Sequence, residues 1–391
     1  MVGQENKVPE GAVVAIRDFV GQMDCVTRVW LVGSRVTGVS SEGARPDVVV
    51  EALGVPVGIP VAGDDADRLR RQWSRALVDR DASVVVALDT LPDAGSVARD
   101  YAITTLVTMA ALDATAGRRV NLHAGAVADK RGRALAMVGP SGSGKTTAVR
   151  LLATRLGYLS DETVSLDETL RVHGHPKPLS IITDPDAPRL KQSVSPDEVG
   201  LLRPPAVSHL HRLVLLHRGE DDAGLAPLAP AYAIAEIVRQ TSSLVELEHP
   251  ILRLADVLDA CGGAWSLSYV EIGERLDDLV GLLDREPQPR PARAHHPGGG
   301  PVGEPAAGAW RRTPWLDAVE YDDELVLMIG DQVRVLAGLG LLAWLALESP
   351  RTLDEVVAEV TSLWGDHPDA RRLVEDALGE LAAQDAVERP S

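Results

Sequence analysis

One stretch of the sequence combines glycines, a lysine and hydroxyl side chains in the spacing of a phosphate-binding loop. Residues 139–147 read Gly-Pro-Ser-Gly-Ser-Gly-Lys-Thr-Thr and match the pattern G-x-x-x-x-G-K-[ST] at every position. Backbone N–H groups of such a loop point at phosphate oxygens, and the dipole of the following helix adds positive potential. The stretch therefore predicts that the protein binds a nucleoside triphosphate, with ATP and Mg²⁺ as the expected cofactors.

The loop residues have separate expected roles. Lys145 should reach the β- and γ-phosphates, and Thr146 should place its hydroxyl on Mg²⁺. The residues expected to bind the nucleotide are Gly139, Ser141, Gly142, Ser143, Gly144, Lys145, Thr146 and Thr147. Residues 134–138 predict a buried strand before the loop, and residues 147–153 continue at helical spacing after it. A glycine-rich turn between strand and helix, without a ligand, is the alternative.

Two adjacent acidic residues, Asp161 and Glu162, follow one helix after the loop. Phosphoryl transfer requires mainly positioning and charge neutralisation, with one carboxylate near the acceptor hydroxyl and one on the metal. Asp161 suits the acceptor and Glu162 suits the metal. Because adjacent residues on a strand point to opposite faces, both can serve one site only where the strand ends. An exposed acidic turn is the alternative.

With His123 before the loop strand and the acidic pair after the loop helix, residues 97–283 resemble the HPr kinase/phosphorylase family. They are most similar to its smaller kinase-like relatives found beside peptide-modification genes. The resemblance implies an α/β P-loop kinase fold of the HPr kinase type, with Asp161, Lys145 and His123 as catalytic residues. For His123, a purely structural role is the alternative.

The chain departs from that family in two features. The second acid of the pair is usually Asp, whereas this chain has Glu162, which can bind Mg²⁺ with a longer reach. The Arg-Gly-Leu-Gly signature of the true HPr kinases is not found after the acidic pair. HPr itself is therefore not the expected substrate.

The C-terminal residues predict a second domain. Residues 325–336 predict a β-hairpin with a Gly-Asp turn, and three helices are expected over 338–347, 352–364 and 369–384. A hairpin with three helices is a winged-helix-like α+β outline, which often binds DNA. Residues 315–391, however, hold 17 Asp and Glu against 5 Lys and Arg, and the whole chain has a net charge of −18. Nucleic acid is therefore not an expected partner.

The order and spacing of apolar residues over 316–388 resemble the PqqD family. Members of that family are small domains that recognise the leader segment of ribosomally made precursor peptides. The peptide joins their hairpin as an added strand, and the corresponding edge here is expected near residues 325–328. The resemblance implies a precursor peptide as partner. A self-contained accessory domain that only packs on the kinase is the alternative.

The sequence predicts four parts: a small α+β N-terminal lobe over 1–96, the nucleotide-binding domain over 97–285, a flexible linker over 286–314 and the peptide-binding domain over 315–391. The linker is rich in Pro and Gly, which predicts two freely tethered domains. Seven histidines receive no role: His173, His175, His209, His211, His217 and the linker pair His295 and His296.

No apolar run is long enough to span a bilayer and no secretory signal is recognised, so we expect a cytoplasmic protein without a membrane partner. The sequence leaves open whether the chain forms a homo-oligomer. The expected function is an ATP-dependent kinase that phosphorylates a Ser or Thr hydroxyl of a precursor peptide. A nucleotide-gated peptide-binding or regulatory protein without phosphotransfer, and a small-molecule kinase, are the alternatives.

Overall fold

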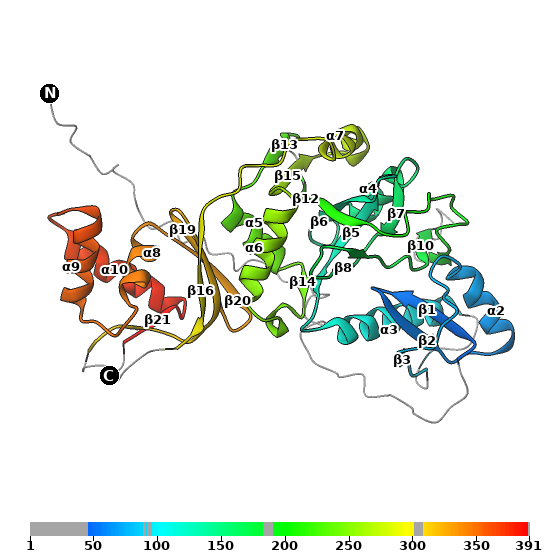
Figure 1. Ribbon diagram of the computed structural model, residues 1–391, viewed down its shortest axis with the longest axis horizontal. Helices are drawn as coiled ribbons and strands as arrows, with labels where there is room; N and C mark the ends of the chain where they lie inside the picture. The colour runs from blue at the N-terminus through cyan, green and yellow to red at the C-terminus, as the bar shows by residue number, and fades with distance from the viewer. Residues whose placement is uncertain are drawn as a thin grey trace.

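The computed structural model describes residues 46–88, 91, 96–182, 191–219, 221–300 and 308–389. The chain is a mixed α/β protein with several sheets. Figure 1 shows an N-terminal lobe at one end of the long axis, a large sheet with helices in the middle, and a C-terminal sheet and helix group at the other end. Within the described ranges, no helix has both the length and the apolar composition that crossing a membrane requires.

The central sheet has six strands. In spatial order they are β13 (Gly224–Pro227), β15 (Ala264–Tyr269), β12 (His209–Arg218), β6 (Arg133–Val138), β5 (Ala124–Ala128) and β7 (Gly157–Ser160). β12 pairs in parallel with β6 and β15, and β5 runs antiparallel between β6 and β7. The carboxyl ends of β6, β7, β12 and β15, and the amino end of β5, therefore meet at one edge of the sheet, which is where open α/β sheets bind ligands.

Helices cover both faces of this sheet, and the alternation along β6 shows why. Leu135 and Met137 pack with α4 (Lys145–Leu152) and α7 (Leu276–Leu282). Ala136 and Val138 belong to the cluster on the opposite face with α5 (Pro230–Val238) and α6 (Pro250–Ala260). Successive side chains of a strand point to opposite faces, so a strand that is covered twice has a continuous apolar sequence. The expected strand and helix around the glycine-rich loop are confirmed.

A smaller sheet and a two-stranded ribbon flank the central sheet. The sheet runs β14 (Thr241–Ser242), β4 (Val120–Leu122), β8 (Val164–Leu166) and β9 (Val172–His173), and the ribbon pairs β10 (Leu179–Ile182) with β11 (Lys191–Val194). β4 leads directly into β5, with His123 as the residue between them. The junction therefore lies at the edge of the central sheet where the parallel strands end.

The N-terminal lobe consists of β1 (Val48–Ala52), β2 (Val55–Ile59), β3 (Val84–Val85), α2 (Gly63–Gln72) and α3 (Val97–Thr115). Residues 1–45 of the expected lobe lie outside the described residues. The sequence predicts that the nucleotide-binding domain begins at residue 97, which would include α3. In the structure, Ile103, Val107 and Ala111 of α3 share a buried cluster with Val48, Val57 and other strand residues of the lobe. The helix therefore completes the core of the lobe.

The C-terminal region has the expected hairpin and three helices. The sheet runs β16 (Arg293–Gly299), β18 (Trp315–Tyr321), β19 (Glu324–Ile329) and β20 (Gln332–Ala337), and the helices are α8 (Gly338–Ala346), α9 (Leu353–Trp364) and α10 (Ala370–Ala383). A short ribbon of β17 (Arg311–Arg312) and β21 (Val387–Glu388) closes the region. Thr352 and Glu355 form a reciprocal capping box at the start of α9. The turn between β19 and β20 is Gly330-Asp331.

The expected flexible linker is wrong for residues 293–299. These residues form the edge strand β16, which pairs antiparallel with β18, so that His295 lies opposite Val319. The sequence did not predict this strand, because proline and glycine usually interrupt a sheet. Pro297 is tolerated here because β16 pairs with one neighbour only, and an edge strand can accommodate a residue that lacks an N–H group.

The prediction that the nucleotide-binding domain and the C-terminal domain are freely tethered is also wrong. One face of the C-terminal sheet contributes Val319, Val326 and Met328 to the same buried cluster as Ile251 and Leu254 of α6. The other face packs on α8, α9 and α10 (Figure 1). The sheet is thus shared between two layers of helices, and removing it would expose the apolar surface of α6.

A buried carboxylate fixes this interface. Asp317 of β18 is fully buried, and its Oδ2 accepts hydrogen bonds from the backbone N–H groups of Ile251, at 2.8 Å, and Leu252, at 2.9 Å. Both groups lie in the first turn of α6, where backbone donors lack partners within the helix and a negative charge is favourable. One domain therefore caps a helix of the other.

The strand expected to accept the peptide is not at an edge. β19, which contains residues 325–328, pairs with β18 on one side and with β20 on the other. Its backbone hydrogen-bonding groups are used within the sheet. Among the strands that the structure describes, β16 and β20 are the two edges of this sheet.

Replacing Asp317 by alanine tests the capping contact. We expect Asp317→Ala to lower the free energy of unfolding by about 2–3 kcal/mol, because two buried N–H groups lose their acceptor. The measurement is urea unfolding followed by circular dichroism. Asp331→Ala, in the exposed hairpin turn, is the control and should change stability little. Equal effects of the two substitutions would contradict the role of Asp317 as a cap.

Candidate functional site

The glycines of the loop over 139–144 are required by its backbone geometry. Gly142 and Gly144 both have φ of +83°, which L side chains rarely adopt. A Cβ on Gly139 would lie 2.7 Å from Ser143 Oγ, and one on Gly144 would lie 2.6 Å from the Tyr269 hydroxyl. The Tyr269 hydroxyl also donates to the carbonyl of Ser143 and thereby holds the loop from β15. The loop is tight and its conformation is fixed.

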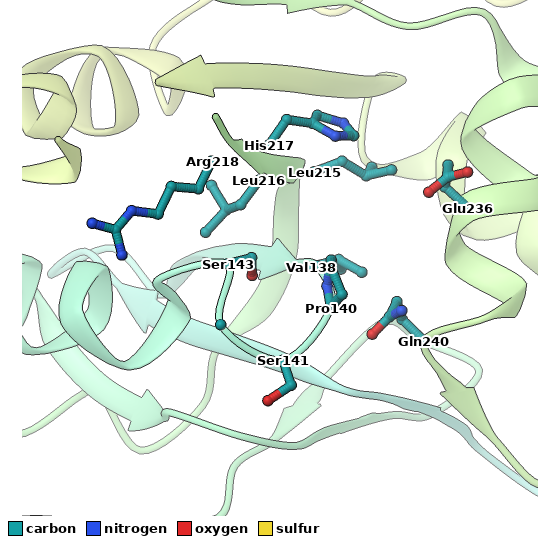
Figure 2. A pocket seen from close by; sticks show the side chains of 12 residues that line it. Val138, Pro140, Ser141, Ser143, Leu215, Leu216, His217, Arg218, Glu236 and Gln240 are labelled. Carbon is teal, nitrogen blue, oxygen red and sulfur yellow. The ribbon is translucent and has the colours of Figure 1, made fainter. Parts of the chain in front are cut away.

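A cavity of about 380 Å³ lies between the loop and the carboxyl end of β12. Residues 138–143 and 215–218 line it, together with Glu236 of α5 and Gln240 just after it. Figure 2 shows Arg218 on one side of the loop and Glu236 and Gln240 on the other. Ser143 Oγ is buried in the loop and has no hydrogen-bond partner among the described residues. A buried hydroxyl without a hydrogen-bond partner, in a cavity lined by a glycine-rich loop, fits a ligand with phosphate oxygens.

Lys145 holds its ammonium group inside the loop. The residue is buried, and its Nζ donates to the carbonyls of Gly139, at 2.5 Å, and Pro140, at 3.0 Å. Burial lowers the pKa of Lys145 to about 8, although the charges of Glu162 and Asp161 oppose the shift. The group is therefore still mainly protonated at neutral pH and can be released toward phosphate oxygens.

The acidic pair follows the carboxyl end of β7, as the spacing required. Ser160 Oγ accepts from the backbone N–H groups of Glu162, at 3.3 Å, and Thr163, at 3.1 Å, which turns the chain at the strand end. Asp161 is 6% exposed and Glu162 is half-buried. The alternative of an exposed acidic turn is therefore wrong for Asp161.

Two neighbours hold the carboxylate of Asp161. The hydroxyl of Tyr158 donates to Asp161 Oδ1 at 3.0 Å. Burial, and then the charge of Asp161, raise the pKa of Tyr158 well above its usual range, so this hydroxyl stays a donor. Lys177 Nζ lies 3.7 Å from Asp161 Oδ1 and 3.2 Å from Glu162 Oε2. Lys177 is buried, which alone would lower its pKa, but the two carboxylates raise the pKa above its ordinary value.

His123 completes the cluster from the amino end of β5. Its backbone N–H donates to the carbonyl of Gln240 at 2.6 Å. Burial, followed by the charge of Lys145, lowers the pKa of His123 to about 4, although Glu162 and Asp161 act in the opposite sense. The imidazole is therefore neutral at physiological pH. The structure thus brings the three expected catalytic residues, Asp161, Lys145 and His123, into one electrostatic cluster.

The remaining predicted residues lie on the loop and the first turn of α4. Ser141, Thr146 and Thr147 are exposed there, and Thr146 is the second residue of α4. All of the residues expected to bind nucleotide are consequently at the edge of the central sheet where β6, β7, β12 and β15 end. Thr146 and Glu162 are the residues that would hold Mg²⁺, since hydroxyl and carboxylate oxygens are its usual protein ligands.

Several residues of the site were given no role by the sequence. Lys177 follows β9, and Arg218 and Glu236 come from β12 and α5, so only the topology brings them to the loop. His217, which received no role, lines the cavity. His175 is instead structural: it is buried, its Nε2 lies 2.9 Å from Thr108 Oγ1, and burial, followed by the charge of Lys177, lowers its pKa to about 3.

Comparison with known proteins does not place the chain in a family. No protein-family model matches the sequence, and a search of curated proteins finds no significant match. The functional interpretation therefore depends on the geometry of the site.

The depressed pKa of Lys145 predicts that nucleotide binding by the loop, if it occurs, depends on pH. Below pH 8 the ammonium is protonated, and above it the charge is lost in the free protein. We expect the affinity for Mg²⁺–ATP to fall by up to about tenfold per pH unit above pH 8. The measurement is calorimetry from pH 6.5 to 9.5, and Lys145→Arg, which stays charged at every pH, should give a flatter profile. Parallel profiles for the two proteins would show that Lys145 does not control binding.

Proposed function

We propose that this protein is a cytoplasmic ATP-dependent kinase of the P-loop type that phosphorylates a Ser or Thr hydroxyl of a peptide. The observation that carries the proposal is the buried carboxylate of Asp161, held by Tyr158 and Lys177 at the same sheet edge as the loop. A protein that binds nucleotide only as a switch needs at most a carboxylate for Mg²⁺ and has no need for an acceptor-side carboxylate.

Different residues of the site can bind the phosphates, hold the metal and accept the proton during phosphoryl transfer. ATP supplies the phosphoryl group, and Mg²⁺ neutralises charge on the phosphates. The loop amides, Ser143 and Lys145 would bind the phosphates, and Thr146 with Glu162 would hold the metal. Asp161 would accept the proton of the acceptor hydroxyl as the oxygen attacks.

Lys177 and His123 set the charge around the catalytic groups. The ammonium of Lys177 lies close to both carboxylates, and its positive charge offsets the repulsion between Asp161 and Glu162. His123 stays neutral next to Lys145, and it can position a phosphate oxygen or a water without adding charge.

A peptide is favoured over a small-molecule acceptor by the position of the C-terminal sheet. In a PqqD-like domain, the peptide would add as a strand to a sheet edge. The edge strand β20 supports this role best, because its Val333 and Val335 pack against the cluster that contains α5 and α6. The other edge strand, β16, contains Pro297 and two glycines, which disfavour further pairing. α5 also supplies Glu236 to the cavity, so the captured peptide would start close to the site.

Replacing Asp161 by asparagine separates a kinase from a nucleotide switch. We expect Asp161→Asn to bind Mg²⁺–ATP about as well as the wild type, but to transfer phosphate 10²- to 10⁴-fold more slowly, the usual contribution of a general base. The measurement is the mass of a precursor peptide encoded next to this protein after incubation with ATP. Glu168→Gln, an exposed carboxylate, is the matched control. Turnover of Asp161→Asn within about threefold of the control would exclude Asp161 as the base.

Strand addition predicts a periodic pattern in the peptide. The full chain should bind the leader without ATP, because the sheet edge exists independently of the nucleotide. A proline scan of the leader should weaken binding at every second position, since alternate N–H groups of a strand face the sheet. Fluorescence anisotropy measures the binding, and an alanine scan of the same positions is the control. Equal effects at successive positions, or no binding of the leader, would exclude strand addition.

A further inference from the structure

Two histidines and an aspartate meet where α6 contacts the C-terminal sheet, outside the cavity of the candidate site. His249 precedes α6, His295 lies on β16 and Asp317 lies on β18. The potential ligand atoms of the three side chains all lie within 4.8 Å of one another. Three segments that are distant in the sequence thus contribute one side chain each.

The atoms that face one another are suitable metal ligands. His295 Nε2 lies 2.7 Å from Asp317 Oδ1, and His249 Nδ1 lies 3.8 Å from the same oxygen. Around a tetrahedral Zn²⁺ with bonds near 2.1 Å, ligand atoms are about 3.4 Å apart, so movements of about 1 Å would complete the geometry. The imidazole rings are already in edge contact, with centroids 4.8 Å apart.

Both the aspartate and one histidine are held in place before any metal binds. The Oδ2 atom of Asp317 is fixed by the amides of Ile251 and Leu252, which directs Oδ1 toward the imidazoles. Hydrogen bonds of this kind, made behind a ligand, orient metal sites. His249 has φ of +50°, an unfavourable conformation for a residue other than glycine, and its ring contacts that of His295.

The charge of the cluster also favours a cation. Asp317 is fully buried, and among the interactions of the described chain its carboxylate has no Lys or Arg partner. Its contacts are two backbone amides and two imidazoles. A divalent ion would neutralise this buried charge, and the half-exposed ring of His249 leaves a route from solvent.

We propose that His249 Nδ1, His295 Nε2 and Asp317 Oδ1 bind one Zn²⁺, with water as the fourth ligand. Two imidazoles and a carboxylate form a common donor set for zinc. His295 would bind as the tautomer that carries its proton on Nδ1. Because the ligands come from both sides of the interface, the ion would fasten the C-terminal sheet to α6. This inference does not depend on the proposed kinase activity.

The test uses the full-length protein without an affinity tag and without nucleotide. Equilibrium dialysis with Zn²⁺ followed by elemental analysis should find one ion that His249→Gln and His295→Gln each bind more than about tenfold more weakly, because even groups behind the ligands contribute 10- to 100-fold. His296→Gln is the matched control, since this neighbour bonds Glu320 instead. Zn²⁺ held by the acidic pair would be unaffected by all three substitutions.

Co²⁺ provides a second measurement that does not depend on stoichiometry. Four-coordinate Co²⁺ in this site should give strong visible absorption, which His249→Gln should abolish, and His249 is exposed enough that its substitution should not unfold the protein. Zn²⁺ should also raise the melting temperature of the wild type and of His296→Gln, but not of His249→Gln. Unchanged Zn²⁺ affinity in both ligand variants, or no four-coordinate Co²⁺ spectrum, would show that the cluster is only a hydrogen-bonded contact.

Discussion

Four parallel strands, β6, β7, β12 and β15, end at the same edge of the central sheet, and each delivers one part of the candidate site there. β6 leads into the glycine loop, β7 into Asp161, and β12 into Arg218. β15 supplies Tyr269, which holds the loop through the carbonyl of Ser143. Because strand direction fixes these positions, charged groups from distant parts of the sequence are brought together with little freedom. Burial at this edge lowers the pKa of Lys145 and, together with the charge of Lys145, that of His123, whereas the nearby carboxylates of Asp161 and Glu162 oppose both shifts.

The C-terminal sheet is integrated into the molecule by packing and by one buried carboxylate. Its two faces contact different layers of helices, and Asp317 caps α6 across the interface. A flexible tether would raise the local concentration of a bound peptide without fixing its direction. A docked sheet fixes that direction as well, so that the length of peptide between the captured leader and the acceptor hydroxyl would become a determinant of which residue is phosphorylated.

The sequence was most informative where local chemistry decides the structure. The glycine loop and the hairpin turn at Gly330 are short-range patterns, and the structure confirms these elements. It was least informative where partners are distant in the sequence. β16 was not predicted, because it contains a proline and two glycines and because its pairing with β18 depends on a partner about twenty residues away. The contact of Lys177 with the acidic pair has the same cause, because the fold alone brings β7 and the chain after β9 together.

The balance of products shows most directly whether phosphate passes from the nucleotide to a hydroxyl of a peptide. The protein would be incubated with Mg²⁺–ATP and the precursor peptide, and ADP, free phosphate and phosphopeptide would be quantified in the same samples. The account predicts that each ADP is matched by one phosphopeptide on a Ser or Thr, with little free phosphate. ADP matched by free phosphate, or nucleotide bound without turnover while the peptide stays unmodified, would contradict it.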